Sequence, residues 1–114
     1  MKFPSELDFL EFFGMEAVEV DPSMAYCRYV KTSSDGNSEL EFSFSAISES
    51  FQVVLRCAGH EMASITSENV SLIEIRTHRR GTGIHVVFDA YGGKSEAEVT
   101  FEPHLHCSWW YLRD

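Results

Sequence analysis

Four segments alternate between apolar and polar residues, and this alternation constrains the fold more than any other feature. Every second residue is apolar in residues 39–45 (ELEFSFS), and the same period recurs in residues 51–57, 83–91 and 96–102. Successive side chains of a β-strand point to opposite faces, so these segments predict strands with one buried face. The residues expected on the buried faces are Leu40, Phe42, Phe44, Phe51, Val53, Leu55, Cys57, Ile84, Val86, Phe88, Ala90, Ala97, Val99 and Phe101.

Turn residues separate the strand-like segments at short intervals. Asp35 and Gly36 lie between two such segments, which is a strong hairpin signal, and residues 79–83 (RRGTG) and 91–94 (YGGK) predict two further reversals. The remaining segments are less regular. We expect a first hairpin from residues 15–20 and 24–30, a weak strand within residues 58–70, and a strand with a bulge over residues 70–78.

The opening residues predict a helix over about residues 5–13. Ser5 is a suitable N-cap, Asp8 follows three residues later as in a capping box, and Gly14 is placed to end the helix. The apolar residues between these caps cover most of the helix surface and leave Asp8 and Glu11 on a narrow polar strip. Such a helix must pack on a neighbouring surface. These apolar residues are Leu7, Phe9, Leu10, Phe12 and Phe13.

A single helix followed by strands predicts a β-dominant α+β domain. A chain of 114 residues forms one core, so residues 1–114 are expected to be one domain, with a strand meander over about residues 15–112. We expect the helix to pack on a curved antiparallel sheet of about seven to eight strands. No apolar run reaches the roughly 18 residues of a membrane span, and charges interrupt residues 1–13, so a cytoplasmic location is expected.

The C-terminal segment (PHLHCSWWYLRD, residues 103–114) contains residue types that metal sites use. As a strand from residue 104, it places His104, His106 and Trp110 on one face and Cys107 and Trp109 on the other, with Trp109 in the core. A zinc site needs a third and usually a fourth ligand, which the sequence does not supply nearby. The pattern favours exposed or hydrogen-bonded histidines and no cofactor, and leaves open whether His104 and His106 bind a metal.

The cysteines give no sign of nucleophilic catalysis. Cys57 and His60 are close in sequence, but Cys57 lies at the inward end of an alternating strand, which favours a buried thiol. Three cysteines without a C-x-x-C pair are typical of reduced thiols rather than a disulfide framework. The sequence contains no phosphate-binding glycine loop, nucleophile elbow or H-E-x-x-H motif. We therefore expect no catalytic residue and no enzymatic activity.

Acidic residues dominate the charge of this chain. It has 18 acidic and 9 basic side chains, a formal net charge of −9, and its first 21 residues hold six carboxylates against Lys2 alone. Such a charge repels nucleic acids and anionic membranes and favours a basic protein partner. The expected partner-binding residues are Asp8, Glu11, Glu16, Glu19, Glu39, Glu41 and Trp110. Further candidate aromatic anchors are Tyr26, Tyr29, Tyr91 and Tyr111.

Short length, acidity, missing catalytic motifs and an opening helix (SELDFLEFFG, residues 5–14) before a strand meander occur together here. In these respects the chain resembles the small cytoplasmic immunity proteins of bacterial polymorphic toxins, including those of contact-dependent growth inhibition systems. The resemblance implies one-to-one binding of a cognate toxin C-terminal domain, commonly a nuclease, by a monomer or weak dimer. Two alternatives stay open: a small-ligand carrier with a phenylalanine-lined pocket, and a homo-oligomer subunit joined through a sheet edge.

Overall fold

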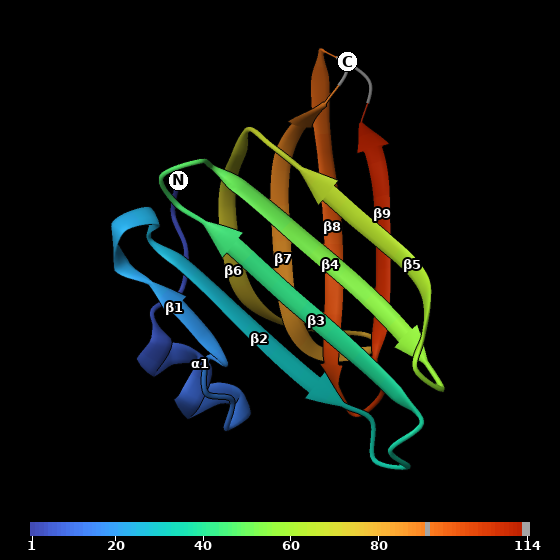
Figure 1. Ribbon diagram of the computed structural model, residues 1–114. Helices are drawn as coiled ribbons and strands as arrows, with labels where there is room; N and C mark the ends of the chain where they lie inside the picture. Colours follow the sequence, from blue (N-terminus) through green and yellow to red (C-terminus); the bar gives the residue numbers. More distant parts are fainter. Residues whose placement is uncertain (91, 113–114) are drawn as a thin grey trace.

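Two antiparallel sheets face each other in the computed structural model, which describes residues 1–90 and 92–112 (Figure 1). The five-stranded sheet has the order β1 (Glu19–Asp21), β2 (Tyr26–Thr32), β3 (Ser38–Ser45), β4 (Ser50–Cys57) and β5 (His60–Ser67). The four-stranded sheet has the order β6 (Val70–His78), β7 (Gly81–Ala90), β8 (Gly93–Glu102) and β9 (His106–Leu112). A short 3-10 helix, η1 (Pro22–Met24), joins β1 to β2. No helix in these residues has the length and apolar character needed to cross a membrane.

The β-dominant α+β class expected from the sequence is confirmed, but the strands form two sheets instead of the single sheet that was expected. The described residues form nine strands in two sheets, where the sequence predicted seven or eight strands in one curved sheet. The division falls between Ser67 and Val70, where Asn69 has a left-handed backbone with φ 60°. Alternation indicates which face of a strand is buried, but it does not indicate where one sheet stops pairing and the next begins.

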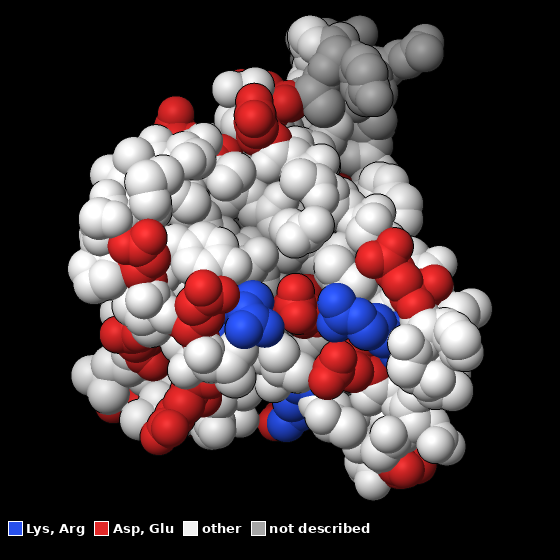
Figure 2. Space-filling model, viewed as in Figure 1, with Lys and Arg blue, Asp and Glu red and all other residues white. Residues whose placement is uncertain are grey.

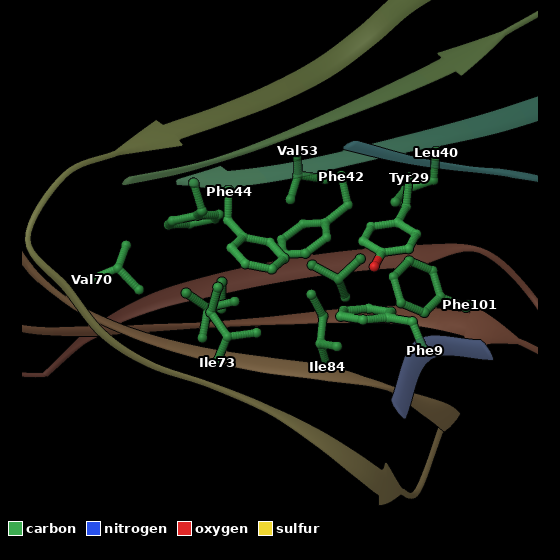
Figure 3. Packing of buried hydrophobic residues seen from close by; sticks show 14 of the residues in the cluster. Phe9, Tyr29, Leu40, Phe42, Phe44, Val53, Val70, Ile73, Ile84 and Phe101 are labelled. Atoms are coloured by element: carbon green, nitrogen blue, oxygen red, sulfur yellow. The ribbon is translucent and has the colours of Figure 1, made fainter. Parts of the chain in front are cut away.

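The core lies between the two sheets, and the predicted inward residues fill it (Figure 3). Phenylalanine rings meet across this space: the ring centroids of Phe51 on β4 and Phe88 on β7 are 5.2 Å apart. Cys57 is an exception, because it is the last residue of β4, beside a turn, and its side chain is exposed. The prediction of a buried Cys57 thiol was therefore wrong. The predicted inward residues that are at most 5% exposed are Leu40, Phe42, Phe44, Phe51, Val53, Ile84, Val86, Phe88, Ala97, Val99 and Phe101.

Helix α1 (Glu6–Phe13) begins and ends as its caps predict. The Ser5 hydroxyl accepts a hydrogen bond from the Asp8 N–H at 3.1 Å, and the Asp8 carboxylate accepts one from the Ser5 N–H at 2.9 Å. This reciprocal pair is a capping box. At the other end Gly14 adopts a left-handed conformation with φ 65°, which glycine tolerates at no steric cost.

The helix lies along one side of the sandwich (Figure 1) and buries Phe9 and Phe13 in the core, where Figure 3 shows Phe9. Phe9 stacks on Tyr29 of β2 with ring centroids 4.2 Å apart, and Phe13 meets Phe101 of β8 edge-on at 5.0 Å. The residues before the helix are held against the four-stranded sheet by two backbone hydrogen bonds. The Lys2 carbonyl accepts from the Ile73 N–H at 2.8 Å, and the Lys2 backbone N–H donates to the Ser71 carbonyl at 3.1 Å. The helix is thus anchored to both sheets.

Candidate functional site

The residues expected to bind a partner are distributed over three separate surfaces. The first surface surrounds α1, the second is the outer face of the five-stranded sheet, and the third is the outer face of the four-stranded sheet. The structure therefore does not gather the predicted residues into one continuous acidic face. In the same order, the three surfaces hold Asp8, Glu11 and Glu16, then Glu19, Glu39 and Glu41, then Trp110.

On the five-stranded sheet the glutamates alternate with arginines in a charged band. Arg28 lies 3.0 Å from Glu19 and 3.3 Å from Glu41, and Arg56 lies 3.2 Å from Glu39 and 3.4 Å from Glu41. Figure 2 shows this alternation of acidic and basic groups across the middle of the face. Each of the three carboxylates already has a guanidinium partner, so this band presents little unbalanced charge to another molecule.

The acidic groups around α1 have a different environment. Glu6, Glu11 and Glu16 are exposed, and none forms an ion pair with any Lys or Arg that the structure describes. Acidic groups gather over the part of Figure 2 where α1 lies. The last turn of α1 contains no basic residue, although the C-terminal end of a helix carries partial negative charge and is stabilised by cations. Glu11 therefore stands where a carboxylate is electrostatically unfavourable in the free protein.

Apolar side chains are exposed beside these carboxylates. Leu7 is 60% exposed and Leu10 is 44% exposed, and both border a hollow of about 350 Å³ whose other lining residues are Glu6, Met15, Glu16 and Ala17. We define the α1 surface as Glu6, Leu7, Leu10, Glu11 and Glu16. The two leucines were not among the predicted site residues. The sequence indicates that some apolar residue of the helix must be exposed, because five apolar residues in an eight-residue helix exceed what one face can bury, but it does not indicate which ones.

A polar row crosses the outer face of the four-stranded sheet. The strand register aligns Glu74 of β6, His85 of β7, Glu98 of β8 and Ser108 of β9. His85 is only 2% exposed, its Nε2 lies 3.5 Å from a carboxylate oxygen of Glu96, and its Nδ1 has no hydrogen-bond partner among the described residues. The row is thus a tightly packed polar layer.

Two other histidines border this row. His78 Nε2 lies 3.3 Å from the Thr100 hydroxyl, and His106 occupies the position opposite Thr100 on β9. Burial, and then the positive charge of Arg80, lower the pKa of His106, which favours its neutral form. Within residues 1–90 and 92–112, no three histidine, cysteine or acidic side chains are grouped so that they could hold a metal ion.

The C-terminal segment differs from its prediction at two positions. Strand β9 begins at His106, and His104 lies exposed in the preceding turn, so the two histidines do not share a strand face. Trp109, predicted to be in the core, is 53% exposed because β9 is an edge strand and its only strand neighbour at this position is Ala97. Trp110 is half-buried on the outer face, with its ring 6.1 Å from that of His85.

The other candidate aromatic anchors have different environments. Tyr29 is 1% exposed and belongs to the core, whereas Tyr26 is half-buried at the start of β2. Tyr91 and the side chain of Tyr111 lie outside the described residues. The sequence reasoning that grouped these four tyrosines could not separate them by depth.

The thiols with shifted pKa values shift in the direction opposite to that of an activated nucleophile. Burial raises the pKa of Cys107 to about 11, and burial together with the Glu6 carboxylate raises the pKa of Cys27. A nucleophilic cysteine needs a lowered pKa, because the thiolate is the reactive form. Cys57 pairs with His60 across the turn between β4 and β5, at the exposed end of the strands. Neither Cys27 nor Cys107 is therefore activated as a nucleophile.

No family model matches the sequence, and no curated protein matches it either. Among solved structures, the fold is similar to that of a chain in a contact-dependent growth inhibition toxin–immunity protein complex from Klebsiella pneumoniae 342. The TM-score is 0.87 and the identity is 21%, and the match covers 97% of this chain and 96% of that chain. The two chains therefore share one fold over nearly their whole lengths.

Proposed function

We propose that this chain is an immunity protein that binds and neutralises a cognate bacterial toxin domain in the cytoplasm of the cell that makes both. The observation that carries the proposal is the shared fold, at TM-score 0.87 over nearly the full length of both chains, with a chain of a toxin–immunity protein complex. An immunity role, rather than the toxin role, is supported by the net charge of −9, which suits the partner of a basic toxin domain.

The proposed partner is a basic C-terminal toxin domain, bound one-to-one without a cofactor. A negatively charged inhibitor attracts a cationic partner over several ångströms, which raises the association rate, while buried anchor residues slow dissociation. The broad set of proposed contact residues is the predicted one: Asp8, Glu11, Glu16, Glu19, Glu39, Glu41 and Trp110. In this role the chain is not an enzyme and binds neither nucleic acid nor membrane.

The packing of the core favours this role over that of a small-ligand carrier. A carrier needs an internal pocket, but the phenylalanine rings of this core contact one another. The ring centroids of Phe42 and Phe44 are 5.6 Å apart, and those of Phe51 and Phe88 are 5.2 Å apart. Hollows bordered by the described residues lie open at the surface beside α1, beside β6 and beside the turns at the ends of β3 and β4.

The test is co-expression with the C-terminal domain of a large secreted protein encoded beside this chain. The domain alone should arrest growth, the domain with this chain should not, and titration calorimetry of the purified pair should give one site per chain. Expression of this chain alone serves as the control and should leave growth unchanged. Growth arrest by this chain alone, or a lack of both rescue and binding, would overturn the proposal.

A further inference from the structure

The α1 surface combines exposed apolar area with a boundary of unpaired charge. Leu7 and Leu10 are three residues apart on the helix, so their side chains are neighbours on its surface. They border the hollow that Met15 and Ala17 also line, and Met15 is only 6% exposed. Clusters of exposed large apolar side chains surrounded by polar groups are typical of protein-binding sites.

The charges around the leucines need a cation that the described residues do not provide. Glu6, Glu11 and Glu16 flank the leucines and form no ion pair with a Lys or Arg among the described residues, and Glu11 lies in the negative last turn of the helix. The three glutamates of the five-stranded sheet, by contrast, are each paired with Arg28 or Arg56. A cationic group gains more electrostatic energy at the α1 surface than at the charged band, because it meets charges that are not already balanced.

These charges also select the kind of occupant. A second copy of this chain docked through the same surface would bring Glu6, Glu11 and Glu16 against the same three carboxylates, which is repulsive. An anionic membrane or a nucleic acid would meet the same repulsion. A protein surface with lysine or arginine around an apolar centre satisfies both the exposed leucines and the unpaired glutamates.

We infer that the cationic partner of this chain docks on the α1 surface, with its apolar groups over Leu7 and Leu10 and its basic groups facing Glu6, Glu11 and Glu16. The inference rests on the proposed function and narrows it. Of the residues predicted from the sequence, Glu11 and Glu16 belong to this contact. The paired Glu39 and Glu41, and Trp110 on the opposite sheet, lie outside it.

The apolar half of the contact is tested with leucine variants and the co-expressed toxin domain as the probe. The double variant Leu7→Ala/Leu10→Ala should bind at least about 30-fold more weakly, because it removes two large apolar side chains from the water-excluded part of the contact. The matched control is Ile47→Ala/Met62→Ala, which removes two apolar side chains that are 66% and 65% exposed elsewhere on the molecule. The control should change the affinity less than about 3-fold. Circular dichroism establishes that each variant is folded.

The electrostatic half is tested by association kinetics. Glu11→Gln/Glu16→Gln should lower the association rate about 3-fold or more at low salt, and the difference should shrink at high salt as ions screen the charges. The control Glu61→Gln/Glu68→Gln removes the same charge from exposed positions away from the helix. It should lower the association rate less than Glu11→Gln/Glu16→Gln does.

The results separate the docking surface from the function. If the wild-type chain binds the toxin domain and both α1 variants bind as tightly and as fast as their controls, the docking surface is wrong and the proposed function stands. If the wild-type chain binds no toxin domain and gives no rescue, the proposed function fails, and the inference fails with it. If the wild-type chain and the control variants bind the toxin domain and the α1 variants bind it more weakly or more slowly, the result supports both the docking surface and the proposed function.

Discussion

Replacement of Phe9 by alanine should destabilise the whole domain, because this ring joins the helix to the sandwich. Phe9 is 0% exposed, and its ring lies 4.2 Å from Tyr29, 6.1 Å from Phe13, and 6.4 Å from both Phe42 and Phe44, measured between centroids. A fully buried phenylalanine contributes about 3–5 kcal/mol relative to alanine, and stacked ring pairs add to the loss. We expect Phe9→Ala to lower the free energy of unfolding by about 4 kcal/mol.

Phe12→Ala is the matched control, since it deletes the same atoms from the same helix. Phe12 is 60% exposed, so its ring buries less than half of its area. In proportion, its loss should be about 1.5 kcal/mol or less. The free energies of unfolding of the two variants should therefore differ by at least about 2 kcal/mol. The change in helix propensity is the same in both variants, so it cancels in this difference.

Urea unfolding followed by circular dichroism and tryptophan fluorescence measures this difference. For a domain whose total stability is about 5–15 kcal/mol, Phe9→Ala should also lower Tm by roughly 15 °C. Equal losses in the two variants, within about 0.5 kcal/mol, would show that the helix is not anchored through Phe9. A normal urea midpoint with only a loss of helical signal would show that the helix detaches without unfolding the sheets.

Three further changes test other parts of the structure. Gly83→Ala should lower the free energy of unfolding by about 3 kcal/mol or more, because the added methyl group collides with the Val99 carbonyl oxygen; an unchanged Tm would contradict this. Arg56→Ala should lower the free energy of unfolding by about 1 kcal/mol at low salt and by less in 1 M NaCl, because it leaves Glu39 without a guanidinium partner and Glu41 with Arg28 alone; a loss independent of salt refutes the pairing. In thiol labelling at pH 8, exposed Cys57 should react rapidly. Cys107, whose pKa is raised from 9.0 to about 11, should react rapidly only near pH 11 or after unfolding, and equal rates at pH 8 would rule out its burial.

Strand faces are predictable where a strand runs through the middle of the sandwich. Phe42 and Val99 have strand neighbours on both sides and a sheet opposite them, so the alternating pattern identifies them as core residues. The pattern fails at ends and edges, because it reports the direction of a side chain and not what covers it. Cys57 at a strand end and Trp109 on an edge strand both point to the expected side and are nevertheless exposed.

The candidate site was only partly predictable for a similar reason. Composition indicates an acidic surface, and alternation places Glu39 and Glu41 together, as the structure also does. Their neutralisation by Arg28 and Arg56 depends on the register between three strands, which local sequence patterns do not determine. The exposure of Leu7 depends on which side of the helix meets the sheets, and an almost wholly apolar helix carries no signal for that choice.

Each sheet is built from one uninterrupted half of the chain, residues 19–67 for the first and residues 70–112 for the second, and every strand ladder joins sequence neighbours. Each half can therefore form hairpin by hairpin with little loop-closure entropy, which favours rapid folding. The long-range event is then the meeting of two preassembled meanders. Cleavage between Glu68 and Asn69, both exposed, would leave every ladder intact within one fragment, so the domain is suited to reassembly from two separately made pieces.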